Sequence, residues 1–155
     1  MRLRLLPLLA LALLAAGCDS GDDDALRLDA AFYTGTWGLV SVADATGDRT
    51  GQTEPFLDDL TVDFRSDGTF TLVANFTAIV NQTVRPDETI TGDFQATAAA
   101  KTLVLISGGV AALFQADATA SDRVALTAPA SIVTGVLGEL PFDLQGDVTL
   151  VVQRR

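Results

Sequence analysis

The sequence has no histidine, and its single cysteine, Cys18, lies close to the start of the chain. Lysine is as scarce, because Lys101 is the only one. The missing histidines exclude a Ser/His/Asp relay, a Cys/His pair and a histidine metal site. A single cysteine excludes a disulfide within the chain. We therefore expect a protein that is not an enzyme and that needs neither a cofactor nor a metal ion.

Positive charge is also scarce. The 10 Lys and Arg residues are outnumbered by 20 Asp and Glu residues, so the formal net charge is −10. Nucleic acids and anionic membrane faces are bound by clustered Lys and Arg residues, so we expect no nucleic-acid partner. The acidic pairs Asp58 with Asp59 and Asp87 with Glu88 fall at turns or strand ends. Carboxylates in such places are normally solvated rather than catalytic.

Long hydrophobic runs are absent except at the start of the chain. Residues 5–16 are all apolar or proline and follow the charged residues Arg2 and Arg4. This run is shorter than the roughly 20 residues that a transmembrane helix needs, and it ends in small residues. We therefore predict that residues 1–17 are a signal peptide that is removed on export.

The end of this signal contains a more specific motif. Leu14, Ala15, Ala16, Gly17 and Cys18 together resemble the lipobox of bacterial lipoproteins, with Ala15 standing where that family more often has leucine. The resemblance implies that the Cys18 thiol receives a diacylglycerol and that the signal is then cleaved directly before Cys18. The chain would then be held at the membrane by its lipid, at about 0.8 kcal/mol for each buried methylene. A plain signal peptide that happens to end near a cysteine is the alternative.

The residues after Cys18 are polar and acidic, and they contain too few apolar side chains to pack. We predict that residues 18–30 form a lipid-anchored tether and that residues 31–155 form a single domain. Removing the signal lowers the net charge to −12, because Arg2 and Arg4 leave with it. The acidic run resembles signals that send some Gram-negative lipoproteins to the outer surface. In other bacteria an aspartate at this place signals retention in the inner membrane, so we expect an envelope location, at the outer membrane or cell surface, with the sorting left open.

From about Thr36 onward, apolar and polar residues alternate with a period of two. Leu60, Val62 and Phe64, for example, alternate with polar residues up to a turn that begins at Ser66. This pattern is typical of strands with one buried face. It predicts eight strands, at about 36–43, 60–65, 70–77, 89–96, 101–106, 110–117, 122–128 and 145–153. Residues 129–141 have apolar residues at helical spacing and are predicted to form a short helix or a wide loop over one end.

Short antiparallel strands joined by tight turns must stack as two sheets or close on themselves, because open edges invite aggregation. We predict an all-β fold, an eight-stranded antiparallel up-and-down barrel, with a β-sandwich as the alternative. A barrel of this size has an interior that is filled by side chains or holds one small ligand.

Gly35, Thr36 and Trp37 at the start of the first strand resemble the opening motif of the lipocalins and of bacterial lipocalin-like lipoproteins. The resemblance implies that Trp37 closes one end of the barrel and that Arg154, or else Arg155, lies against its ring. A guanidinium over an indole contributes about 0.5–2 kcal/mol. The alternative is that both arginines belong to a solvated chain end.

Large apolar residues lie on the predicted inner faces of the strands. They either fill the barrel or line a cavity beside smaller residues such as Ala74 and Gly92. Our expected function is an envelope lipoprotein that binds a small hydrophobic ligand. The alternative is a non-catalytic scaffold or interaction subunit with a filled barrel, which would contact an unknown protein partner through the loops at 44–57 and 129–143. The candidate cavity-lining residues are Phe64, Phe70, Leu72, Phe76, Phe94 and Phe114.

Replacing Cys18 by serine tests the predicted lipid anchor, because a serine hydroxyl cannot take the place of the thiol that is alkylated. In a Gram-negative host, we expect the wild-type chain to sediment with membranes and to carry the added mass of a lipid. The Cys18→Ser chain should carry no lipid and should keep residues 1–17, because cleavage follows lipidation, and a Ser20→Ala control should behave as wild type. Fractionation and mass spectrometry give the answer, and a wild-type chain without lipid would contradict the prediction.

Overall fold

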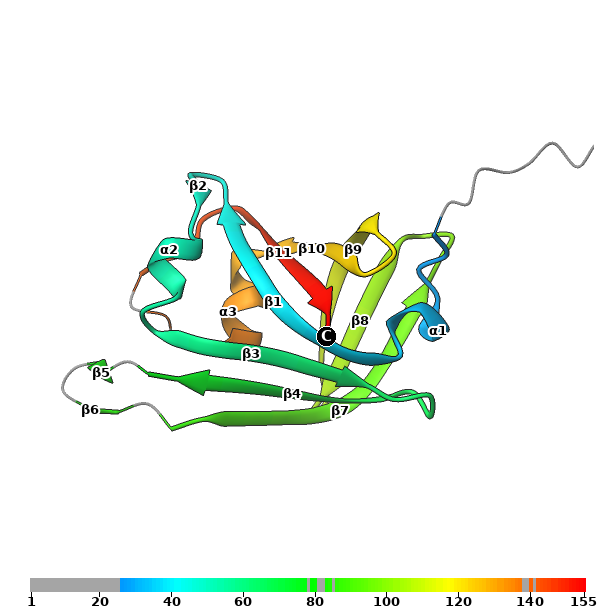
Figure 1. Ribbon diagram of the computed structural model, residues 1–155, viewed down its shortest axis with the longest axis horizontal. Coiled ribbons are helices and arrows are strands. Elements are labelled where there is room, and N and C mark those ends of the chain that lie inside the picture. Colours follow the sequence, from blue (N-terminus) through cyan, green and yellow to red (C-terminus); the bar gives the residue numbers. More distant parts are fainter. Residues whose placement is uncertain (1–25, 78, 81–82, 85, 138–139, 141) are drawn as a thin grey trace, which may run out of the picture.

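The computed structural model describes residues 26–155 except 78, 81–82, 85, 138–139 and 141 (Figure 1). The predicted signal peptide, Cys18 and residues 18–25 of the predicted tether lie outside this part of the chain. Within it, eight strands have six residues or more. They are β1 (Gly35–Asp44), β3 (Leu57–Phe64), β4 (Thr69–Phe76), β7 (Glu88–Thr97), β8 (Thr102–Ser107), β9 (Val110–Ala120), β10 (Arg123–Pro129) and β11 (Asp147–Arg154).

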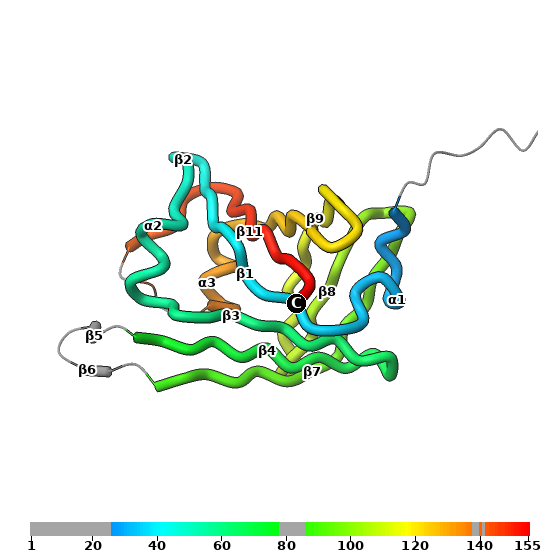
Figure 2. Tube along the Cα trace, viewed as in Figure 1, coloured from blue at the N-terminus to red at the C-terminus, as the bar shows by residue number. Residues whose placement is uncertain are grey.

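These eight strands form one closed sheet. Each pairs antiparallel with the next of the eight along the chain, and β11 pairs back with β1 (Figure 2). The short β2 (Gly47–Asp48) pairs antiparallel only with the end of β1, and β5 (Ile79–Val80) pairs with β6 (Thr83–Val84). The protein is therefore a closed eight-stranded antiparallel up-and-down barrel, as predicted. The pairing of β11 with β1 excludes the β-sandwich.

Alternation along each strand sends one set of side chains inward. In β4, for instance, Phe70, Leu72, Ala74 and Phe76 are buried, and the residues between them are half exposed. The inward residues of all eight strands form a single apolar core that also includes Leu28, Tyr33 and residues of the last helix. Packing therefore begins at Leu28, inside the range assigned to the tether.

Helices lie at the two sides of the barrel. α1 (Ala30–Tyr33) begins at Asp29, whose carboxylate accepts a hydrogen bond of 3.1 Å from the Phe32 amide. α3 (Ala130–Leu137) lies well away from α1 along the long axis (Figure 1) and corresponds to the segment predicted as a helix or a loop. Val133 and Leu137 of α3 are fully buried. No helix in the described part of the chain has the length and apolar character needed to cross a bilayer.

The predicted loop 44–57 contains β2 and α2 (Thr50–Thr53), and Asp44 fixes its start. The Asp44 carboxylate accepts hydrogen bonds from Thr46 and from the amide of Gln145, and it pairs with Arg49 at 3.1 Å. The bonds from Thr46, aided by Arg49 and Gln145, hold the pKa of Asp44 well below its usual range. The carboxylate therefore ties the end of β1 to the segment before β11.

The barrel wall has a gap between β7 and β8. β7 pairs with β4 from Asp93 back to Glu88, whereas it pairs with β8 only from Asp93 onward. Residues 89–92 thus have β4 on one side and no paired strand on the other within the described chain. β8 stops at Ser107, because Gly108 and Gly109 adopt positive φ angles of 57° and 80° and reverse the chain.

Gly92 lies where the two neighbouring strands approach most closely. A Cβ atom built on Gly92 would lie 2.0 Å from the carbonyl oxygen of Ile106 and 2.9 Å from the ring of Phe70. Real Cβ atoms do not approach backbone oxygens this closely, so a side chain here would push β8 away from β7. The gap therefore begins at a position where glycine is required.

We expect Gly92→Ala to lower the free energy of unfolding by about 1–3 kcal/mol, because the added methyl group overpacks the junction of β7 with β8. Urea denaturation with circular dichroism measures the change. Gly135→Ala in α3 is the matched control, since a Cβ there meets no atom within 4 Å. That variant should gain about 0.5–1 kcal/mol from helix propensity. A Gly92→Ala protein as stable as wild type would contradict the packing described here.

Candidate functional site: an apolar pocket at the gap in the barrel wall

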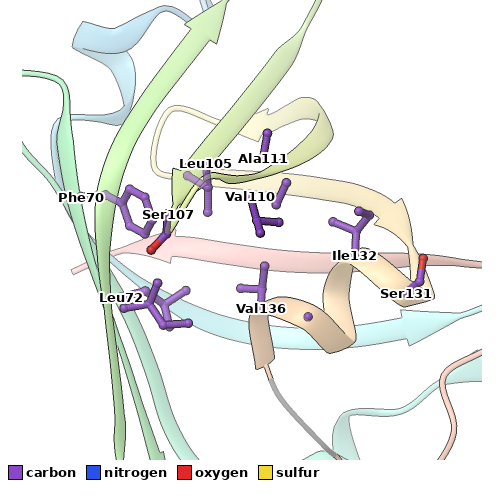
Figure 3. A pocket seen from close by; sticks show the side chains of 12 residues that line it. Phe70, Leu72, Leu105, Ser107, Val110, Ala111, Ser131, Ile132 and Val136 are labelled. Carbon is purple, nitrogen blue, oxygen red and sulfur yellow. The ribbon is translucent and has the colours of Figure 1, made fainter.

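A pocket of about 360 Å³ lies at the gap between β7 and β8 (Figure 3). Its walls come from β4, β7, the β8–β9 hairpin and α3. The pocket opens to the surface beside Val110, which is 71% exposed. The lining residues are mainly apolar: Phe70, Leu72, Ile90, Leu105, Ser107, Val110, Ala111, Ala112, Ser131, Ile132, Gly135 and Val136.

Three local features create this pocket. The glycine turn ends β8 early, so β7 extends past it without a neighbour. The Ser107 hydroxyl then donates a hydrogen bond of 2.7 Å to the carbonyl oxygen of Thr91, and this bond joins the two strands at the point where their pairing stops. α3 packs against the gap and contributes Ile132 and Val136 to the pocket wall.

The interior of the barrel is separate from this pocket and nearly full. A void of only about 30 Å³ remains there, and it is lined by apolar side chains that include Trp37, Phe64 and Phe114. The ring of Phe94 packs edge-on against Phe64, with 4.8 Å between the ring centroids. Leu72, Leu105 and Val136 line both the void and the larger pocket, so these three side chains stand between the two spaces.

The structure distributes the six candidate lining residues over different surroundings. Phe70 and Leu72 line the pocket at the gap. Phe64 and Phe114 border the small void, and so does Leu72. Phe94 belongs to the packed core. Phe76 is buried at the end of β4 and lines neither of these two spaces.

Sequence analysis missed most of the pocket wall, namely the residues of the β8–β9 hairpin tip and of α3. Two signals were visible: the turn at Gly108 and Gly109, and the helical spacing of Ile132 and Val136. Neither signal says that α3 packs against the gap left by the short β8. That arrangement depends on the relative lengths of two neighbouring strands.

The other end of the barrel is closed by aromatic residues. Trp37 is fully buried, and its indole nitrogen donates a hydrogen bond of 2.6 Å to the carbonyl oxygen of Tyr33. The Arg154 guanidinium carbon lies 4.7 Å from the Trp37 ring centroid. Arg154 also donates hydrogen bonds to the carbonyl oxygens of Phe32 and Thr34, so it links β11 to α1.

Arg155 has a different place. Its side chain passes over Gly38 and forms an ion pair with Asp59 on β3. The structure therefore places Arg154, and not Arg155, against Trp37. Tyr33 and Phe32 complete this end of the barrel, and sequence analysis did not single out either of them.

The site offers no reactive chemistry of its own. None of the pocket-lining residues has an ionisable side chain. In the described part of the chain, no three His, Cys, Asp or Glu side chains come together as metal ligands. Asp59 pairs with Arg155, and the Asp87 carboxylate accepts a hydrogen bond of 3.0 Å from the amide of Phe76. The arrangement can exclude water from an apolar molecule and hold it, which is a binding role.

Comparison with known proteins adds little to this description. No protein-family model matches the sequence, and no curated protein matches it. Among solved structures, a redesigned β-barrel resembles the chain with a TM-score of 0.47 and 14% sequence identity. The match covers 84% of this chain and 98% of that chain. This likeness carries no information about function.

Tyr33 is the only tyrosine of the chain, and its buried hydroxyl has no hydrogen-bond partner among the described residues. Burial raises its pKa to about 12. An absorbance titration of tyrosinate should therefore have its midpoint near pH 12 in the folded protein and near the unperturbed value of about 10 in denaturant. The unfolded chain loses this proton first, so stability should fall as the pH rises from about 10 towards 12.

Tyr33→Phe serves as the control for this titration. This variant should show no tyrosinate absorbance change. It should also lack the loss of stability at alkaline pH that the ionisation of Tyr33 causes. Because the hydroxyl has no partner to lose, stability at neutral pH should be kept or slightly raised. A folded-state midpoint near 10 would show that the hydroxyl reaches water.

Proposed function

We propose that this protein binds a small apolar ligand in the pocket between α3 and the gap in the barrel wall. The observation that carries the proposal is the pocket itself, which has about 360 Å³ and an apolar lining. Ligand sites in proteins commonly measure roughly 300–1,000 Å³, so this volume suits a small molecule. They are also mostly apolar, with a few polar groups that orient the ligand.

The exposure of the pocket rim supports the same proposal. Val110 is the most exposed of the large apolar residues in the described chain, at 71%, and it lines the pocket. Each square ångström of apolar surface removed from water contributes about 25 cal/mol. A ligand that covers the rim and fills the pocket would gain this contribution without a rearrangement of the barrel.

The proposed setting is the bacterial envelope, with the chain attached through a lipid on Cys18 as the lipobox resemblance implies. The described chain starts beside α1, at the end closed by Trp37, and α3 lies far from this point along the long axis (Figure 1). In this setting the tether leaves from the closed end of a lipocalin-like barrel. The pocket beside α3 is then free of the attachment point.

An interaction subunit is the second candidate, and one observation favours it. Residues 89–92 of β7 have no strand beside them on the β8 side within the described chain, so an extended segment of a partner could add there as a further strand. The nearly full barrel interior also agrees with a scaffold. The first candidate binds a small molecule, whereas the interaction subunit binds a protein partner, so a small-molecule binding test separates them.

Gly135→Leu tests the ligand site, because a Cβ at Gly135 meets no atom within 4 Å and the leucine would extend from the pocket wall. The neutral fluorescent probe N-phenyl-1-naphthylamine should bind the Cys18→Ser chain produced without residues 1–17, which carries no lipid and needs no detergent. Gly135→Leu in this background should weaken binding by about tenfold or more, a loss of about 1.4 kcal/mol. Fluorescence titration measures the affinity.

Thr134→Leu is the matched control, since Thr134 is an exposed neighbour on α3 that does not line the pocket. It should bind the probe as the parent chain does. Circular dichroism melting shows that both variants fold. If the parent chain did not bind the probe, or if both variants bound it equally well, the ligand site would be contradicted and the interaction subunit favoured.

A further inference from the structure

Few of the side chains that line the pocket are polar, and none of them carries the positive charge that an anion site commonly has. Of the 12 lining side chains, only Ser107 and Ser131 carry polar atoms, and both are hydroxyls. Figure 3 shows Ser107 beside Phe70 and Ser131 at the start of α3, far apart in the view. The ligand therefore meets apolar walls with a single hydroxyl at each side.

The cationic side chains of the described chain lie outside the pocket and have partners there. Arg49 pairs with Asp44 at 3.1 Å, Lys101 with Asp117 at 3.3 Å, and Arg155 with Asp59. Arg27 pairs with Asp29 and Arg65 with Asp63. Arg123 donates a hydrogen bond to Gln153, and Arg154 donates one to the carbonyl oxygen of Thr34 and lies over the Trp37 ring.

This arrangement has a clear electrostatic consequence. A carboxylate or phosphate that enters the pocket loses part of its hydration, and no lining residue supplies a compensating charge. The net charge of −10 over the chain adds repulsion of the same sign. The pocket therefore disfavours anionic amphiphiles such as fatty acids.

Ser107 adds a second selection. Its hydroxyl hydrogen is used in the bond of 2.7 Å to the carbonyl oxygen of Thr91. The Ser107 oxygen keeps lone pairs, so towards the pocket this group acts as a hydrogen-bond acceptor. An acceptor at the wall favours a ligand whose polar end donates a hydrogen bond.

We propose that the pocket selects uncharged amphiphiles whose single polar end is a hydrogen-bond donor, such as a long-chain alcohol or a primary amide. This inference rests on the proposed function, because it names the class of ligand for the same pocket. The apolar chain lies against Phe70, Ile90 and α3, and the donor lies at Ser107.

Displacement of N-phenyl-1-naphthylamine from the Cys18→Ser chain at neutral pH tests this class. The competitors are decanol, methyl decanoate and decanoate, which present a donor, a neutral acceptor and an anion on similar chains. We expect decanol to bind about two- to tenfold more tightly than methyl decanoate, as one net hydrogen bond allows. We expect decanoate to bind about tenfold or more weakly than decanol.

Variants separate these effects from the general hydrophobicity of the competitors. Ser107→Ala should reduce decanol to the affinity of methyl decanoate, with both measured against the probe affinity of the same variant, and Ser131→Ala is its matched control. Ser131→Lys places a cation at the rim and should strengthen decanoate binding by about tenfold with little change for decanol. Thr134→Lys adds the same charge on α3 outside the pocket lining and should not do so.

Each outcome decides a separate point. Decanoate binding as tightly as decanol, or no gain from Ser131→Lys, would overturn the selection against anions. A Ser107→Ala chain that still prefers decanol would overturn the assignment of the donor end. Probe binding without displacement by any competitor would overturn the ligand class and leave the proposed function standing, whereas no probe binding at all would overturn both.

Discussion

The barrel depends on one set of contacts, the antiparallel pairing of β11 with β1. This pairing runs from Trp37 opposite Arg154 to Ala43 opposite Thr149 and removes the two edges that an open sheet of these strands would expose. It also sets the aromatic end of the barrel, because the register brings Arg154 to the strand position opposite Trp37. The backbone ladder and the cation–π contact are therefore two results of one alignment, and the hydrogen bonds from Arg154 to α1 follow from the same placement.

The gap between β7 and β8 is an irregularity in this closed barrel, because β7 pairs with β8 over only part of its length. β7 has ten residues and β8 has six, so the wall is incomplete beside residues 89–92. α3 covers the inner side of this gap with apolar side chains and leaves an accessible pocket. The same irregularity thus provides both the candidate ligand site and an unpaired strand edge.

The fold could be predicted from the sequence because alternation is a local property. Leu60, Val62 and Phe64 identify a strand wherever it lies, and the glycine turns identify its ends. The boundaries were less accurate: β3 begins at Leu57, three positions before the alternation becomes clear, because the acidic residues Asp58 and Asp59 interrupt the pattern. The helix at Ala130–Leu137 was visible from its spacing, although its packing partner was not.

The candidate site could be predicted only in part, for a physical reason. Phe70 and Phe64 lie on the same faces of paired strands and look equivalent in the sequence, yet one lines the pocket and the other the small inner void. What separates them is their distance from the gap, which depends on strand lengths and on the close approach at Gly92. The roles of Tyr33 and Ser107 could not be predicted either. Tyr33 acts through its contacts with Trp37, and Ser107 through its hydrogen bond to the carbonyl oxygen of Thr91, and the fold decides both contacts.

The position of Val136 limits how large a molecule the barrel can accommodate. Its side chain stands between a pocket of about 360 Å³ and a void of about 30 Å³ that continues into the centre of the molecule. Leu72 and Leu105 stand there as well, so a smaller residue at this helix position would widen the space beside them, and a bulkier residue would make the pocket shallower. The room for the guest molecule therefore depends in part on a helix position that lies outside the strands that hold the barrel closed.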